Sequence, residues 1–160
     1  MVTLFISHIR PLMDFAARLW NVGYLGDLRM LERVQRSWVG QIEGMESIQY
    51  EECIKQLGVY SVHGRLLRGD LIKIWQAFHS TSNTGLDRLL DMQAHAATRS
   101  NGYKLAIPRC RTELRRRFWS VRCVQRWNSL PADVVQANTM ECFKGRLDRH
   151  LGDALYSTVD

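Results

Sequence analysis

An arginine-rich segment in the C-terminal half of the chain carries the residues best suited to bind a ligand. Residues 109–131 contain seven arginines and only one acidic residue, Glu113. Guanidinium groups pair with phosphate oxygens, so the chemistry that this segment offers is the binding of a polyanion. The surplus of six positive charges equals the net charge of the whole chain, +6, so the remaining sequence is nearly balanced. The basicity is therefore local.

A single helix over residues 112–128 would bring part of this charge onto one side. At helical spacing, the positions of Arg115, Trp119, Arg122 and Arg126 form one stripe. Arginines can contact phosphates there, and a flat ring between them can stack on an unpaired base. We therefore predict a nucleic-acid-binding site made of the following residues: Arg109, Arg111, Arg115, Arg116, Arg117, Trp119, Arg122 and Arg126. The alternative is a solvated face of an amphipathic helix, with Trp119 at the margin of the core.

Residues that could perform catalysis are not grouped in this sequence. Polymerases and nucleases hold divalent metal ions with clustered carboxylates, whereas the acids here are dispersed and the adjacent pair, Glu51 and Glu52, lies in a charged amphipathic stretch. The glycines are isolated, unlike those of phosphate-binding loops. A Cys–His nucleophile pair stays open, although structural roles are favoured for the five histidines. We expect no catalytic residue, no metal and no cofactor.

The four cysteines show no pattern of a shared site. They are Cys53, Cys110, Cys123 and Cys142. No two of them are close in sequence, and no histidine stands at zinc-finger spacing from them. We interpret them as reduced thiols, which is typical of an intracellular protein.

Composition indicates a globular chain about the size of one domain. It has 160 residues, 46% of them hydrophobic, and no uncharged apolar run long enough to cross a membrane. Residues 1–12 are apolar but lack a basic leader and reach Arg10 and Pro11 early, so we do not interpret them as a signal peptide. We expect the protein in the nucleus or cytoplasm, with no membrane contact.

Hydrophobic spacing predicts an all-α protein, an irregular helical bundle with a basic C-terminal helical extension. Helices are expected over residues 3–20, 28–38, 49–57, 62–79 and 112–128, and after Thr139. The expected core residues are Leu31, Trp38, Leu71, Trp75, Phe78, Phe118, Trp127 and Phe143. Pro131 should end the basic helix by Ser129, with Trp127 buried just before that end.

Local signals refine the ends of these helices. Asp27, Ser61 and Thr139 are expected N-caps, and Gly58 is an expected C-cap. Pro11 should kink or break the first helix. That helix is apolar on two sides, so one side is expected to remain open, and such a surface implies either a partner or poor solubility.

Phrases spread over nearly the whole chain resemble a known family when they are taken together. They occupy residues 9–16, 20–21, 31–36, 50–52, 57–61, 65–72, 118–131 and 143–147. In this order they resemble the thumb and post-thumb region of reverse transcriptases from non-LTR (LINE-type, jockey-like) retrotransposons. The chain departs from the family at Gln49, where a serine is common. The family's palm, with its paired catalytic aspartates, would precede Met1, as would its endonuclease domain, so no catalytic residue is carried over.

The resemblance implies a catalytically incomplete fragment of an RNA-directed DNA polymerase, not an enzyme on its own. Residues 1–80 would be a thumb-like helical region, 81–108 a linker and 109–160 a basic helical region. The expected partner is RNA or an RNA/DNA hybrid, the element's own RNA by resemblance. The alternative is a helical protein-interaction domain with no nucleic-acid role, in which Trp38, Trp75 and Trp127 are core residues and the basic stripe only keeps the protein soluble.

Overall fold

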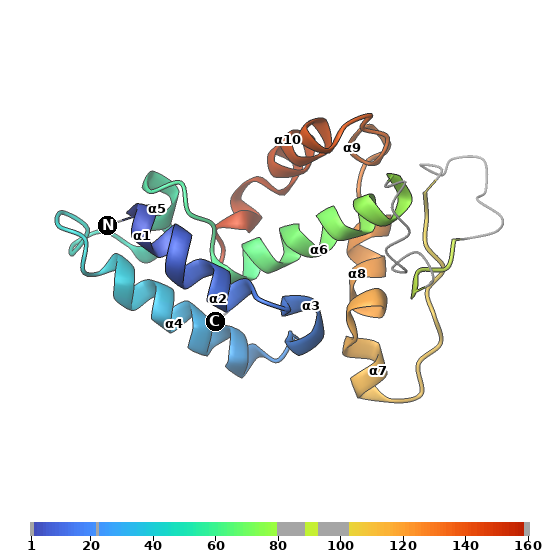
Figure 1. Ribbon diagram of the computed structural model, residues 1–160, viewed down its shortest axis with the longest axis horizontal. Coiled ribbons are helices and arrows are strands. Elements are labelled where there is room, and N and C mark those ends of the chain that lie inside the picture. The colour runs from blue at the N-terminus through green and yellow to red at the C-terminus, as the bar shows by residue number, and fades with distance from the viewer. Residues whose placement is uncertain (1, 22, 80–88, 93–102, 159–160) are drawn as a thin grey trace. The chain divides into compact units, whose positions relative to one another are not determined.

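The structure, a computed structural model, describes residues 2–21, 23–79, 89–92 and 103–158. These residues are mostly helical, and the only β pairing among them is one isolated bridge between Met92 and Leu105 (Figure 1). The all-α prediction is confirmed. The chain divides into two compact units: unit 1 comprises residues 1–67 and 151–160, and unit 2 comprises residues 68–150.

This division differs from the predicted boundaries after residues 80 and 108. The boundary falls inside helix α6 (Val62–His79), because Val62 and Leu66 belong to the core of unit 1 while Trp75 stacks on Phe143 of unit 2. Most of the predicted linker lies outside the described residues. Its last part, from residue 103, is bonded to a helix of unit 2 and does not behave as a linker.

Unit 1 begins with one continuous helical segment that changes from α-helix to π-helix and back to α-helix. It consists of α1 (Val2–Leu4), a π-helix η1 (Phe5–Ile9) and α2 (Arg10–Asp14). The chain does not break at Pro11, because this proline lies in the first turn of α2, where a backbone N–H would have no partner within the helix. The π-helical turn before it is closed by a hydrogen bond from the Arg10 N–H to the Phe5 carbonyl. The break lies at Ala16, which has a φ of +49°.

Three further helices of unit 1 follow. They are α3 (Ala17–Trp20), α4 (Leu25–Val39) and α5 (Tyr50–Gln56). Asp27 is not the N-cap of α4, because the helix starts two residues earlier and places Asp27 in its first turn. Gly58 ends α5 as predicted: its φ is +63°, its N–H bonds to Lys55, and Val59 N–H bonds to Ile54. This pair of bonds is a Schellman motif.

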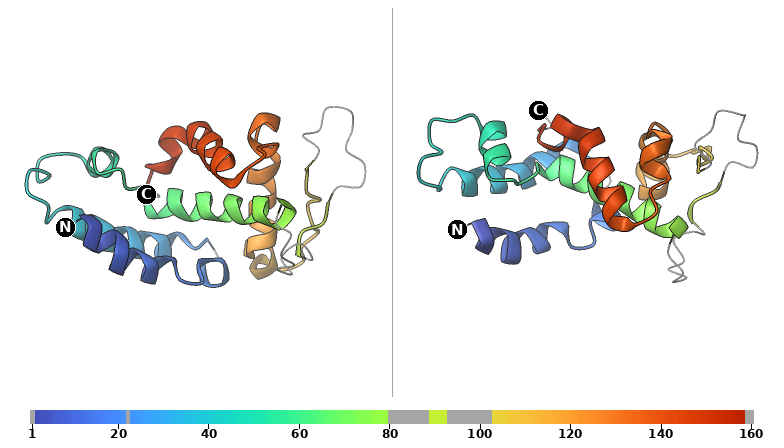
Figure 2. Two further views of the ribbon diagram at one scale, coloured as in Figure 1. Left: turned by 45° about the horizontal axis from the view of Figure 1, so that its top comes forward. Right: turned by 90° about the horizontal axis from the view of Figure 1, so that it is seen from above.

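The core of unit 1 is formed by its first helical segment and α4, which run side by side in Figures 1 and 2, together with residues of α3, α5 and the start of α6. The Phe5 ring stacks on Trp38, with 4.0 Å between centroids. A buried carboxylate, Glu32, accepts hydrogen bonds from the Tyr50 hydroxyl at 2.6 Å and from Val62 N–H at 2.9 Å. Burial, followed by the charge and hydrogen bond of Glu32, raises the pKa of Tyr50. These bonds connect α4 to α5 and α6.

The C-terminal segment packs on the start of α6. Ser61 caps this helix as predicted, because its Oγ accepts the Gly64 N–H at 3.0 Å. Ser61 N–H donates to the Leu155 carbonyl at 2.9 Å, in the 3-10 helix η3 (Gly152–Leu155). The approach is so close that a Cβ on Gly64 would lie 2.2 Å from the Leu155 carbonyl oxygen.

Among its described residues, unit 2 contains the rest of α6 and four α-helices further along the chain. They are α7 (Glu113–Arg117), α8 (Trp119–Asn128), α9 (Ala132–Val135) and α10 (Met140–Leu151). Helix α8 ends at Asn128, as the Pro131 rule predicted. Thr139 accepts the Cys142 N–H at 3.2 Å, so the predicted N-cap of α10 is confirmed.

Residues 103–105 run beside α8 and lie next to it in both views of Figure 2. Trp127 is fully buried, as predicted, and its indole N–H donates to the Tyr103 carbonyl at 2.7 Å. The Asn128 amide bonds both backbone groups of Leu105, at 2.9 and 2.8 Å. Of the predicted core, Trp38, Leu71, Trp75, Trp127 and Phe143 are buried, while Leu31, Phe78 and Phe118 are half-buried.

Candidate nucleic-acid interface

The arginine-rich segment is not the single helix that its spacing predicted. Thr112 caps α7, since its hydroxyl oxygen accepts the Arg115 N–H at 3.3 Å. The chain then extends at Phe118, with φ −61° and ψ 145°, before α8 begins. The predicted stripe of Arg115, Trp119, Arg122 and Arg126 is therefore interrupted between its first two members.

Trp119 is buried, with only 2% of its surface exposed, which corrects its prediction as a base-stacking residue. The cause lies in α8 itself. Trp119, Cys123 and Trp127 follow one another at steps of four residues, and all three are buried. This apolar row is present in the sequence, where it competes with the row of basic residues on the same helix. In this structure the ring is not available to a nucleic acid.

Three of the seven arginines already have carboxylate partners. Arg116 and Arg117 share Glu113, at 2.8 and 2.9 Å. Arg122 pairs with Asp70 of α6 at 2.8 Å, and both side chains are largely buried. Arg122 therefore has a structural role, in contrast to its predicted role in binding, whereas two guanidinium groups of α7 share one carboxylate.

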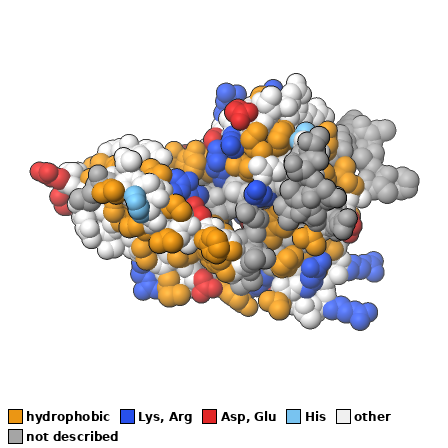
Figure 3. All heavy atoms as spheres, in the orientation of Figure 1, with side chains coloured by type: hydrophobic (Ala, Val, Ile, Leu, Met, Phe, Trp, Pro, Cys, Tyr) orange, Lys and Arg blue, Asp and Glu red, His pale blue; other side chains and the backbone are white. Residues whose placement is uncertain are grey.

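The other four arginines have no ion pair with any described residue. These unpaired arginines are Arg109, Arg111, Arg115 and Arg126, and all are exposed. The Arg115 guanidinium lies over the Phe118 ring, 5.4 Å from its centroid. Figure 3 shows Lys and Arg side chains projecting near α7 and the segment that leads into it. These are the predicted binding residues that the structure leaves open to a ligand.

Charge is divided very unequally between the two units. By sequence, unit 2 holds 15 Lys and Arg against 7 Asp and Glu, whereas unit 1 holds 7 against 9. Unit 2 thus carries a net charge of +8 and unit 1 a net charge of −2. A polyanion would be attracted to unit 2 alone.

Cys123 belongs to the same buried contact as Asp70 and Arg122. Its thiol donates to Asp70 Oδ2 at 3.4 Å. Burial first, and then the negative charge of Asp70, raise the pKa of Cys123 far above its ordinary value. The neutral thiol is a poor nucleophile, so this cysteine is not a reactive one.

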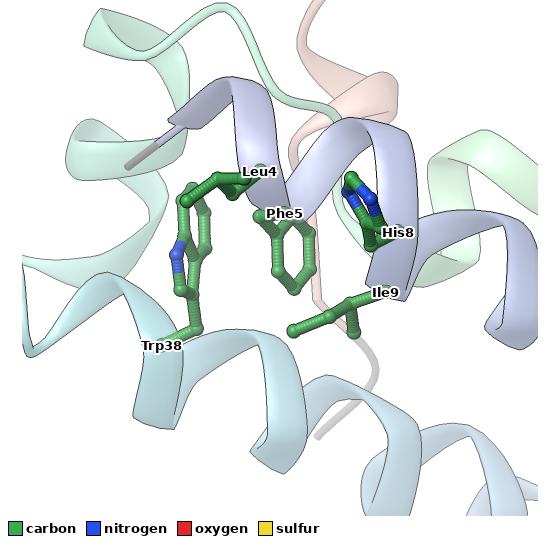
Figure 4. Close-up of a pocket in the computed structure, with 5 residues that line it drawn as sticks. All are labelled: Leu4, Phe5, His8, Ile9 and Trp38. Carbon is green, nitrogen blue, oxygen red and sulfur yellow. The ribbon is translucent and has the colours of Figure 1, made fainter.

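Unit 1 keeps an exposed apolar surface on its first helical segment, as predicted. Leu4, Leu12 and Phe15 are 64%, 78% and 77% exposed. Figure 3 shows hydrophobic side chains gathered over this segment. Beside it lies an open pocket of about 280 Å³, in which Phe5 stands between Trp38 and the side chains of His8 and Ile9 (Figure 4).

Within the described ranges, no group of three His, Cys, Asp or Glu side chains is placed to hold a metal ion. None of the described helices has the length and apolar character needed to cross a membrane. Comparison with known proteins finds no matching family model, curated protein or solved structure. The likeness to retrotransposon reverse transcriptases therefore rests on the sequence phrases and remains a prediction.

Proposed function

We propose that unit 2 binds nucleic acid through Arg109, Arg111, Arg115 and Arg126, with Arg116 at the margin. The single observation that carries this proposal is the +8 charge of unit 2, together with four exposed arginines that no described carboxylate neutralises. Exposed guanidinium groups can neutralise phosphates and so release the cations condensed on the nucleic acid, and this release drives binding.

We further propose that the chain is a part of a non-LTR retrotransposon reverse transcriptase outside its catalytic palm, with RNA or an RNA/DNA hybrid as its partner. The support is the order of the family-like phrases along the sequence. We assign no polymerase chemistry to these residues.

The test is binding of labelled RNA by the full chain, followed by fluorescence anisotropy. The variant Arg109→Gln/Arg111→Gln/Arg115→Gln should lose about tenfold or more in affinity, because three phosphate contacts disappear. A matched control with three exposed arginines of α4, Arg29→Gln/Arg33→Gln/Arg36→Gln, should bind like wild type. Equal losses in both variants would mean that net charge alone attracts RNA, and no loss in the first would contradict the proposal.

A second candidate function, a protein-interaction domain, is favoured by the exposed apolar residues Leu4, Leu12 and Phe15. Monomeric proteins rarely expose large contiguous apolar patches unless they bind a partner. Under this reading the arginines only keep the protein soluble, and wild type would show no salt-dependent affinity for RNA.

A further inference from the structure

The aromatic side chains of unit 2 are all withdrawn from solvent to some degree. Trp75, Trp119, Trp127 and Phe143 are buried, and Phe78, Tyr103 and Phe118 are half-buried. Phe78 also packs on both Tyr103 and Trp127. The residues of unit 2 outside the described ranges contain no Trp, Tyr or Phe in the sequence. In its described part, unit 2 therefore offers no exposed Trp, Tyr or Phe ring, and its remaining residues contain none of these three types.

Phe118 contacts one of the unpaired arginines, Arg115, so one face of its ring is already occupied. The guanidinium of Arg115 lies 5.4 Å from the ring centroid. A cation held over an aromatic face is attracted by the ring's negative face. Phe118 thus orients Arg115, and a base stacked on the same face would have to displace that guanidinium.

Proteins that bind single strands combine a basic surface with aromatic rings on which successive bases stack. Unit 2 has the first of these features and lacks the second. Its remaining donors are guanidinium groups, which recognise phosphate oxygens regardless of base. The double helix presents about one phosphate charge per 1.7 Å of axis, counting both strands, whereas one strand alone presents about half of that. A surface with arginines but no exposed Trp, Tyr or Phe ring therefore gains more binding energy from the denser phosphates of a duplex than from those of a single strand.

We propose that the ligand of unit 2 is double-helical nucleic acid, held by its phosphate backbone with no recognition of bases. This inference rests on the proposed function and narrows it. It also replaces the expected preference for unpaired bases, which depended on an exposed Trp119.

The experiment compares a duplex RNA of about two helical turns, roughly 20 base pairs, with its two separated strands, using the full chain at one salt concentration. Duplex should bind about tenfold more tightly than either strand, and a second duplex of scrambled sequence should agree with the first within about twofold. The variant Phe118→Leu should keep the same ratio of duplex to single-strand affinity. A circular dichroism spectrum of each variant confirms its helical content.

Tighter binding of a single strand than of duplex would overturn the inference while leaving the proposed function intact. A loss of single-strand affinity alone in Phe118→Leu, by more than about fivefold, would do the same, because it would reveal a stacked base. A difference between the two duplexes above about fivefold would show base recognition and also overturn it. Failure to bind any of these ligands would overturn the proposed function, and this inference with it.

Discussion

Arg122 of α8 donates to the carboxylate of Asp70 in α6 across 2.8 Å, with 19% and 9% of the two side chains exposed. The residues are 52 positions apart in the sequence, so the pair ties two distant segments of unit 2 together. The contact removes one arginine from the candidate binding surface, and it places a buried carboxylate beside a buried thiol, that of Cys123.

Breaking this pair should destabilise the protein without weakening nucleic-acid binding. Arg122→Gln leaves the buried Asp70 carboxylate without its cation, which should lower the free energy of unfolding by about 2 to 4 kcal/mol in urea titrations. Arg126→Gln, an exposed position on the same helix, is the matched control and should change it by less than about 0.5 kcal/mol. Equal stability of both variants would show that Asp70 finds another partner.

Truncating Trp127 should be among the most damaging changes in unit 2. Trp127→Ala opens a cavity where the side chain is fully buried and leaves the Tyr103 carbonyl without its donor, so we expect a loss of about 3 to 5 kcal/mol. Trp127→Phe keeps most of the volume and loses the hydrogen bond, and should cost less. Chemical denaturation measures both, and a loss below about 1 kcal/mol for the alanine variant would mean that the ring is not part of the core.

Two glycines of α6 should respond in opposite ways to the same substitution. Gly64→Ala places a methyl group 2.2 Å from the Leu155 carbonyl oxygen, so the C-terminal segment must move, at a cost of about 1 to 3 kcal/mol or more. Gly69→Ala meets nothing within 4 Å and should stabilise the helix by about 0.5 to 1 kcal/mol. Thermal unfolding of the two variants would show whether the C-terminal segment packs against α6, since equal effects are incompatible with that contact.

Stability should fall in mild alkali because of Cys123. Its pKa is raised in the folded protein, so above about pH 8.5 the unfolded chain loses this proton while the folded chain keeps it. The unfolded state then binds fewer protons, and the free energy of unfolding decreases with pH, by about 1.4 kcal/mol per unit at the steepest. Urea titrations between pH 7 and 10 measure the slope. Cys123→Ala should flatten it, and an unchanged slope in that variant would assign the effect to other groups.

Those features of the fold that depend on neighbouring residues could be predicted from the sequence. Ser61 and Thr139 cap helices because a hydroxyl can reach a free N–H three residues ahead, and Gly58 ends α5 because it tolerates a positive φ. Pro131 ends α8 for an equally local reason. Such features need no knowledge of what lies elsewhere in the chain.

The candidate site could be predicted only in part, because its geometry depends on distant contacts. No local rule places a break at Phe118, and nothing near Arg122 in the sequence points to Asp70 as its partner. The buried row of Trp119, Cys123 and Trp127 was the one available signal that the tryptophan belongs to the core. The boundary between the units inside α6 is likewise set by packing.

The most direct test of the central claim is the slope of log affinity against log salt for duplex RNA. The variant Arg109→Gln/Arg111→Gln/Arg115→Gln/Arg126→Gln should reduce the magnitude of this slope by roughly 2.8 to 3.6, since each of the four lost phosphate contacts removes roughly 0.7 to 0.9. Arg122→Gln, measured where it remains folded, should leave the slope unchanged. A quadruple variant that is folded and retains the wild-type slope would contradict the account.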